Sequence, residues 1–270
     1  MGFNSNIDNR KIIYIGELIY RAFSMQNNLI DCLNEIKNLS IQDAYRVQDY
    51  FLSKIEKNNK KNLIGWKLGL TSNQLQKKFN TKGPCFGQIH KNNIFYSPKT
   101  LNLSSLVRIG IENEVAIRLR EDIPSKNELY TSKDIIKYIK SFHSAIEIVD
   151  DQGVNSKDID IGFLISMNVF NRYIVLGKEK PINEINDLRN LKTRLILNNK
   201  LIENGNTNNV MGDPINSLVW LANNVSISGN KLKKDDIIIT GTTLDPKWIK
   251  SNGIIESVIE NLGVSILEIE

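Results

Sequence analysis

The chain has 270 residues, of which 41% are hydrophobic and 24% are charged, and its formal net charge is +5. This composition is typical of a globular protein with a sizeable core, arranged as one large domain or two small ones. Lysine and arginine are spread along the chain and form no basic or aromatic-basic stripe, so no nucleic-acid partner is expected. No apolar run approaches the roughly 20 residues of a membrane span, so no membrane partner is expected either.

The cysteine pattern and the first residues bear on the cell compartment. Cys32 and Cys85 lie far apart and form neither a disulfide framework nor a Cys-x-x-Cys metal pattern. The first residues lack the apolar stretch of a secretory signal. Together these features predict a cytoplasmic protein.

The first 60 residues have helical spacing. Ile12, Ile15, Ile19 and Phe23 recur at intervals of three and four, and the pattern continues to about residue 37. Ser40 is the expected N-cap of a second helix. The sequence therefore predicts an N-terminal helical cap, residues 1–60, before a mixed β core, residues 61–270. The boundary is soft, and a single domain is the alternative.

Most of the later elements are predicted to be strands. Short helices are expected after Ser72 and over residues 131–139, a loop over 83–87, and a longer helix from Pro214 to about Val225. A hairpin is expected over 194–202 around Asn198-Asn199, followed by a turn at Asn204-Gly205. Residues 153–166 have no clear pattern. The other predicted strands are residues 63–70, 89–96, 108–120, 141–152, 173–176, 237–240, 254–259 and 264–269.

Two of these strands carry acidic residues at unusual positions. Alternation places Glu112 and Glu114 on one face of strand 108–120, while Glu147 is the one acid within the apolar run Ala145–Val149. One interpretation is a solvated sheet face. The other is a cation site, because three carboxylates on core strands repel one another unless a cation joins them. Oxygen-only ligands suit Mg²⁺ or Mn²⁺.

Lys67 is the single charge in the strand LIGWKLGL. It is either an edge residue whose ammonium reaches solvent or a desolvated cation that faces an anionic ligand. An unpartnered lysine in this setting would have a lowered pKa. Familiar nucleotide and hydrolase motifs are missing, and the two histidines, His90 and His143, exclude the His-Glu-x-x-His zinc motif.

The ordered segments GWKLGLTS, GPCFGQI, IENEVAI, SAIEIVDD, VMGDP, SLVWLANN, LKKDDIIITGT and LGVSI resemble the fumarylacetoacetate hydrolase superfamily. The resemblance runs from about Ala44 to Glu270 and is strongest to the branch of 2-keto-4-pentenoate hydratases and 4-oxalocrotonate decarboxylases. It implies an α+β fold, a mixed β roll with an N-terminal helical layer, in a homo-oligomer.

The resemblance also implies a site. Its metal ligands would be Glu112, Glu114 and Glu147, holding Mg²⁺ or Mn²⁺. Lys67 and Thr242 would be the catalytic residues, acting on a small 2-oxo or 2-hydroxydienoic acid through a metal-bound enolate. The substrate-binding residues would come from the GLTS, FG and TGT segments: Leu70, Thr71, Ser72, Phe86 and Gly241.

Some family positions differ here. Cys85 stands where related hydratases often carry an acid, and Met167 and Phe170 replace an acid and a serine around the retained Asn168. A proton shuttle built from those groups would be weakened or moved, and decarboxylation suffers less from such losses than hydration. Hydratase chemistry is the first expectation. The alternatives are decarboxylation of a 4-oxalocrotonate-like acid, hydrolysis of a C–C bond in an acylpyruvate, and a non-catalytic descendant.

Overall fold

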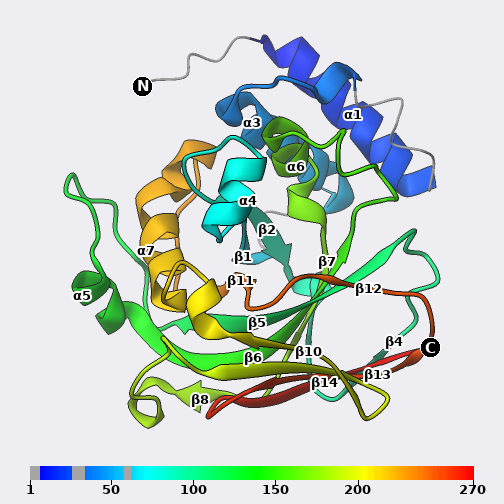
Figure 1. Cartoon of the computed structure of the whole chain (residues 1–270). Coiled ribbons are helices and arrows are strands. Elements are labelled where there is room, and N and C mark those ends of the chain that lie inside the picture. The colour runs from blue at the N-terminus through cyan, green and yellow to red at the C-terminus, as the bar shows by residue number, and fades with distance from the viewer. Residues whose placement is uncertain (1–6, 26–33, 58–61) are drawn as a thin grey trace.

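A computed structural model describes residues 7–25, 34–57 and 62–270. Two sheets form the lower and central parts of the molecule, and helices cover the upper part and one side (Figure 1). The helices are α1 (Asn9–Met25), α3 (Ile41–Ile55), α4 (Asn73–Lys78), α5 (Ser132–Ile135), α6 (Ile161–Ser166) and α7 (Pro214–Asn224). Short 3₁₀ turns are Lys91–Asn93, Ile136–Tyr138, Asn168–Phe170, Ile182–Glu184, Thr207–Asn209 and Val225–Ser228.

In the described part of the chain the larger sheet has nine strands. Its main path runs β2-β1-β11-β5-β6-β7-β3, with β12 paired to β5 and β8 paired to β6. The bounds are β1 (Leu63–Gly69), β2 (Cys85–His90), β3 (Ile94–Tyr96), β5 (Ile109–Leu119), β6 (Ile139–Asp150), β7 (Asn171–Leu176), β8 (Lys180–Pro181), β11 (Ile237–Thr242) and β12 (Lys247–Ile249). The long antiparallel pair β5–β6 lies at its centre, so both edges of that pair are hydrogen-bonded to further strands, β11 and β7.

The second sheet has five described strands in the order β10-β9-β13-β14-β4. They are β4 (Lys99–Leu101), β9 (Lys192–Leu197), β10 (Lys200–Asn206), β13 (Gly253–Ile259) and β14 (Gly263–Ile269). Alternate residues of β13 and β14 are buried, among them Ile255 and Leu267, which pack with Ile146 and Ile148 of β6. This sheet therefore covers the face of β6 opposite to Glu147.

Helix α3 ties the N-terminal helices to the larger sheet. Its N-cap Ser40 accepts a hydrogen bond from the Asp43 amide, as the sequence predicts. The fully buried Gln48 donates from Nε2 to the carbonyls of Phe86 on β2 and Ile165 on α6. Ala44 and Tyr45 belong to the same core cluster as the strands β1 and β2. The division into a cap, 1–60, and a core, 61–270, stays a prediction.

Most predicted elements are confirmed. Helix α1 matches the expected helical spacing as far as Met25, whereas Cys32 lies outside the described residues. The hairpin β9–β10 turns at Asn198 and Asn199, both with positive φ. Three expectations are wrong: Cys85–Gly87 belong to β2 instead of a loop, Asn204 and Gly205 lie in β10 and pair with β9, and the single strand expected over 89–96 is broken by the 3₁₀ turn Lys91–Asn93. Residues 161–166, for which the sequence has no clear pattern, form α6.

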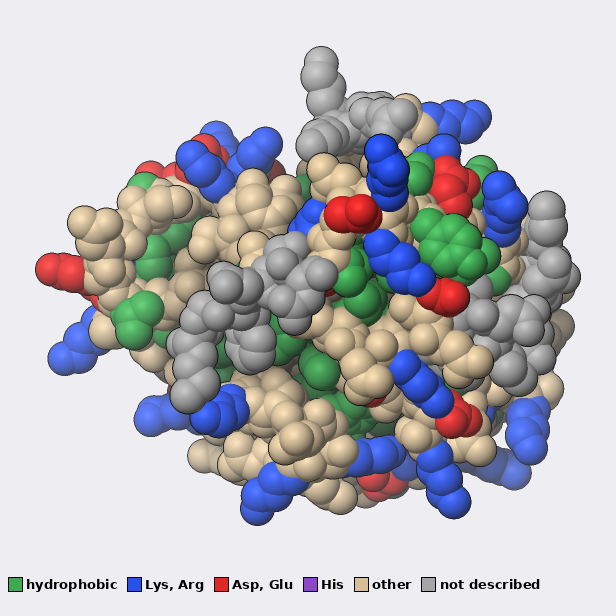
Figure 2. Space-filling model, turned by 90° about the horizontal axis from the view of Figure 1, so that it is seen from above, with side chains coloured by type: hydrophobic (Ala, Val, Ile, Leu, Met, Phe, Trp, Pro, Cys, Tyr) green, Lys and Arg blue, Asp and Glu red, His purple; other side chains and the backbone are tan. Residues whose placement is uncertain are grey.

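No helix in the described ranges is long and apolar enough to cross a membrane. On the face shown in Figure 2, lysine and arginine side chains are scattered, with acidic side chains between several of them. This distribution matches the even spread of charge along the sequence.

Candidate metal centre

The register of β5 and β6 brings the three glutamates together. Glu112 lies directly opposite Glu147 in the antiparallel ladder, and Glu114 is two residues further along β5. Partners across a ladder and residues two apart on a strand share one face. One carboxylate oxygen from each of the three lies within 4.8 Å of the others. Glu114 and Glu147 are fully buried and Glu112 is partly buried. The solvated-face interpretation is therefore wrong.

Lys67 reaches the same cluster from β1. Its Nζ lies 3.1 Å from Glu147 Oε1, and its side chain is only 3% exposed. The ammonium is thus buried against carboxylates and does not extend to solvent. Burial disfavours the charged form, but the charges of Glu147, Glu112 and Glu114 outweigh burial and raise the pKa of Lys67 above its usual value. The expected lowering of this pKa is wrong, because the partner, Glu147, is remote in sequence.

The carboxylates are electrostatically strained by one another. Burial, the largest cause, and the charge of Glu147 raise the pKa of Glu112 to about 7, although Lys67 opposes the shift. Burial and the charges of Glu147 and Glu112 raise the pKa of Glu114 well above its usual range. Such shifts are expected where like charges share a site with little solvent.

Neutral donors hold one oxygen of each buried glutamate. The amide of Gly241 donates to Glu114 Oε2 over 2.7 Å, and Asn171 Nδ2 donates to Glu147 Oε1 over 2.8 Å. The other oxygens, Glu114 Oε1 and Glu147 Oε2, accept no hydrogen bond from the described residues. Each buried glutamate therefore keeps one free oxygen for a further partner. Sequence reasoning missed Asn171, which carries no motif and lies 24 residues after Glu147.

The GLTS and TGT segments meet beside the glutamates. Gly241 has φ +115°, and a Cβ there would lie 2.2 Å from Thr71 Oγ1, so only glycine fits. Leu70 has φ +58°, and Ser72 caps α4 by accepting from the Leu75 amide. The Thr242 hydroxyl donates to the Leu244 carbonyl at 2.5 Å. Its proton is thus taken by a backbone carbonyl, and the donor to Glu114 from this segment is the Gly241 amide.

Phe86 does not face the site. Lys67 is paired with Gly87, and Gly69 with Cys85, so Cys85 and Gly87 share the face of Lys67. Phe86 lies on the opposite face, is fully buried, and stacks on Tyr45 with ring centroids 4.2 Å apart. The prediction that Phe86 binds substrate is wrong, because strand alternation turns its ring into the core. On the site face, burial raises the pKa of the Cys85 thiol to about 12, despite the charge of Lys67.

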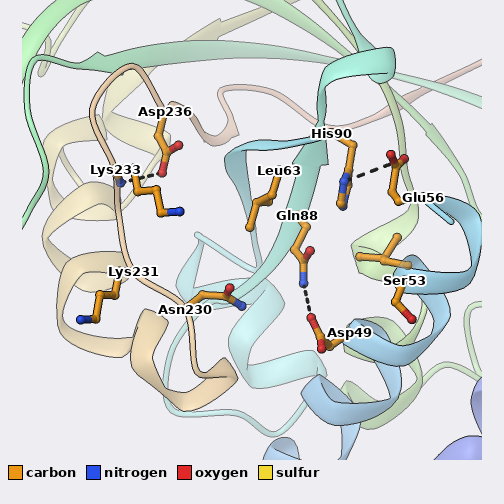
Figure 3. Close-up of a pocket in the computed structure, with 11 residues that line it drawn as sticks. Asp49, Ser53, Glu56, Leu63, Gln88, His90, Asn230, Lys231, Lys233 and Asp236 are labelled. Carbon is orange, nitrogen blue, oxygen red and sulfur yellow. Dashed lines mark hydrogen bonds and ion pairs between the residues drawn. The ribbon is translucent and has the colours of Figure 1, made fainter. Parts of the chain in front are cut away.

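Among the cavities near these strands, two differ in their relation to the predicted site. One, of about 510 Å³, is lined by Thr71 and Ser72 together with Lys82, Asn208 and Trp220, and so adjoins the predicted substrate-binding segment. The other, of about 150 Å³, lies between α3 and the loop that precedes β11. In Figure 3 Gln88 points toward Asp49 and His90 toward Glu56, whereas Asp236 lies on the opposite side of the cavity. None of its lining residues belongs to the glutamate cluster.

The fold and the cluster define a class: a mixed α/β protein with a carboxylate-type candidate metal centre on the central strands of a curled sheet. The family model for the fumarylacetoacetate (FAA) hydrolase C-terminal domain matches residues 81–269. The chain therefore belongs to the fumarylacetoacetate hydrolase family.

Individual relatives agree with this assignment. A 2-keto-4-pentenoate hydratase from Burkholderia vietnamiensis is 28% identical over 222 residues, which are 82% of each protein. The 4-oxalocrotonate decarboxylase from Pseudomonas putida G7, solved with magnesium and adipate, has a TM-score of 0.90 at 21% identity and covers 99% of this chain and 100% of its own. A fumarylpyruvate hydrolase from Pseudomonas aeruginosa, solved with Mn²⁺ and pyruvate, has a TM-score of 0.58 at 12% identity over 76% of this chain and 88% of its own. The names of the hydratase and the decarboxylase indicate an enzyme of the lyase type.

Phe86→Leu tests the core position of Phe86. Replacing this buried, stacked ring should lower the free energy of unfolding by on the order of 1 kcal/mol, measured by urea denaturation. Mg²⁺ affinity and kcat/KM of the folded protein should stay at the wild-type level. A loss of turnover without a loss of stability would show that the ring contacts substrate after all.

Asp236 gives a test of pH-dependent stability. Burial raises its pKa to about 6, from an ordinary value of 3.8, although the Lys233 amide and Trp66 Nε1 donate to it. The folded state thus binds this proton more tightly than the unfolded state, and the stabilisation is lost as the pH rises from about 4 through 6. Asp236→Asn should stabilise the protein at pH 7 by on the order of 2–3 kcal/mol and flatten the change between pH 5 and pH 7.

The control is Asp235→Asn, which removes the same charge from an exposed neighbour. Urea denaturation at pH 5, 6 and 7 should give this variant the wild-type pH dependence. Equal behaviour of the two variants would contradict a buried, proton-binding Asp236.

Proposed function

We propose that this protein is a divalent-metal-dependent lyase that acts on a 2-oxo or 2-hydroxydienoic acid, with hydratase-type chemistry as the first candidate. The observation that carries the proposal is the cluster of three glutamates with a buried lysine against one of them. The hydratase and decarboxylase relatives support the reaction class. Assembly into a homo-oligomer stays a prediction.

The chemistry of the donor set fits a divalent cation such as Mg²⁺ or Mn²⁺. Three glutamates and one lysine, when all are ionised, leave a net charge of −2 in a buried site. Carboxylate oxygens are the ligands that these hard cations prefer. The free oxygens Glu114 Oε1 and Glu147 Oε2 would serve as ligand atoms, with Glu112 providing the third carboxylate. Solved relatives with magnesium or Mn²⁺ agree with this choice.

When bound, the cation supplies Lewis acidity to a chelated 2-oxo acid. The chain's own residues then orient and neutralise the substrate. Lys67 offers positive charge and an N–H to the substrate carboxylate or to its 2-oxygen as negative charge develops there. Gly241 and Asn171 hold the glutamates so that Glu114 and Glu147 each present one oxygen. The cavity beside Thr71 gives the remainder of the substrate a place to lie.

A decarboxylase is the second candidate, and Cys85 is the observation that favours it. The thiol shares the face of Lys67, and burial keeps its pKa at about 12, so it is neutral at physiological pH. It is therefore a poor replacement for the acid that would move protons during the addition of water. Loss of a terminal carboxylate needs chiefly an electron sink. Incubation with Mg²⁺ and either a 2-hydroxydienoate or a dicarboxylic 2-oxo-enoate, followed by product analysis, separates hydration from release of CO₂ and from C–C hydrolysis.

Glu114→Gln tests the metal centre. Losing a residue that only orients a ligand costs about 10–100-fold in metal affinity, so replacing a charged ligand should cost more than about 100-fold. Isothermal titration calorimetry with Mg²⁺ measures the change. Glu256→Gln, on β13 of the other sheet, is the control and should bind as wild type does. Wild-type Mg²⁺ affinity in the Glu114→Gln variant would contradict the proposed metal site.

Lys67→Met tests the role of the buried ammonium. Turnover should fall by on the order of 10²-fold or more, the scale for loss of one electrostatic donor. The metal-free variant should also melt at a lower temperature, because the carboxylates lose their positive partner, and Mg²⁺ should recover much of that loss. kcat/KM and melting curves with Mg²⁺ or a chelator are the measurements. Normal turnover by the folded fraction would make Lys67 a structural residue.

A further inference from the structure

A left-handed segment lies directly against Lys67. Asn168, Val169 and Phe170 have φ values of +54°, +52° and +60° in succession. Asparagine tolerates this conformation, but a β-branched residue such as Val169 rarely adopts it. Backbone of this kind persists only where the surroundings over-determine it, and it is concentrated at functional sites. We call residues 168–170 the left-handed turn.

Asn168 anchors the turn to β2. Its Oδ1 accepts from the Gln88 amide over 2.6 Å, and its Nδ2 donates to the Gln88 carbonyl over 3.0 Å. The side chain is buried, so this pair of bonds is shielded from water. Asn168 therefore holds both the backbone N–H and the backbone carbonyl of Gln88, on the strand that pairs with β1.

Two glycines leave room for the turn on the face of Lys67. A Cβ at Gly87 would lie 2.7 Å from Asn168 Oδ1, and a Cβ at Gly69 would lie 2.5 Å from Val169 Cγ1. Gly87 is the cross-strand partner of Lys67, and Gly69 follows Lys67 by two residues. The turn thus packs against β1 and β2 beside Lys67, at a distance that a side chain at Gly69 or Gly87 would prevent.

The turn contacts the lysine itself. Lys67 Nζ donates to the Val169 carbonyl over 3.2 Å and lies 3.1 Å from Glu147 Oε1. An ammonium group has three N–H bonds in tetrahedral arrangement. Two fixed partners therefore determine the direction of the third N–H.

We propose that Asn168 is a positioning residue: it holds the left-handed turn, and the Val169 carbonyl then directs the remaining N–H of Lys67 toward the bound anion. This inference rests on the proposed function for the identity of that anion, a 2-oxo acid. It assigns Asn168 no contact with substrate, and no part in binding the cation, because its hydrogen bonds go to β2 and not to the glutamates.

Oxalate is a suitable probe, because it mimics the chelating end of a 2-oxo acid and needs no turnover. Calorimetry with saturating Mg²⁺ should show that Asn168→Ala and Asn168→Gly bind oxalate at least about 10-fold more weakly than wild type, with Mg²⁺ affinity unchanged. Glycine adopts the left-handed backbone without strain, so the Asn168→Gly variant separates loss of the side-chain hydrogen bonds from backbone strain. kcat/KM should fall in parallel.

The chain provides a matched control. Asn223 makes the same clamp elsewhere, accepting from the Tyr130 amide over 2.8 Å and donating to the Tyr130 carbonyl over 3.1 Å. Asn223→Ala should therefore lose stability, as the Asn168 variants do, but keep wild-type oxalate binding and turnover.

A double-mutant cycle asks whether Asn168 acts through Lys67. Asn168→Ala added to Lys67→Met should weaken oxalate binding no further than Lys67→Met alone. Additive losses of oxalate affinity in the double variant would overturn the role of Asn168 but leave the proposed function standing. Wild-type oxalate binding by Asn168→Gly would do the same. Failure of the wild-type protein to bind oxalate with Mg²⁺ would overturn the proposed function, and this role of Asn168 with it.

Discussion

Mutual repulsion of the buried glutamates is the constraint on which the site depends. Glu112 and Glu147 are direct cross-strand partners, and Glu114 is on the same face, so the register of two long strands forces like charges together. Like charges directly opposite one another destabilise a sheet, and burial makes the effect larger. Lys67 supplies only one positive charge against them. The folded chain therefore carries electrostatic repulsion at this site, and a bound cation would relieve it.

The rest of the larger sheet maintains that register. A slip of one residue between β5 and β6 would move Glu112 and Glu114 to the face now occupied by Ile111 and Val115. The buried apolar residues on that face and the second sheet packed against β6 make such a slip unfavourable. Hydrophobic burial therefore holds the carboxylates in an arrangement that their own electrostatics oppose, as is typical of functional sites.

The sequence predicts the acidic residues of the site better than their surroundings. An acid inside an apolar run stands out, so Glu147 could be found by pattern, and alternation was enough to pair Glu112 with Glu114. The proline and glycines of residues 83–87 wrongly predict a loop, because Gly87 lies within a strand and allows close packing there instead of forming a turn. The same alternation, applied to β2, would have placed Cys85 and Gly87 on the site face and Phe86 in the core. The partners of Lys67 could not be found this way, because Glu147 and Val169 are brought to it only by the folded sheet.

The groups that orient this site are nearly all neutral. The Gly241 amide holds Glu114, the Asn171 amide holds Glu147, and the Val169 carbonyl holds Lys67. Neutral donors and acceptors fix direction without altering the net charge that a cation must balance. The glutamate cluster and the lysine are consequently oriented without the flanking family positions, two acids and a serine, that Cys85, Met167 and Phe170 replace here. Replacement of those flanking groups can therefore change how protons move, and so the reaction, while the electrostatic core of the site is preserved.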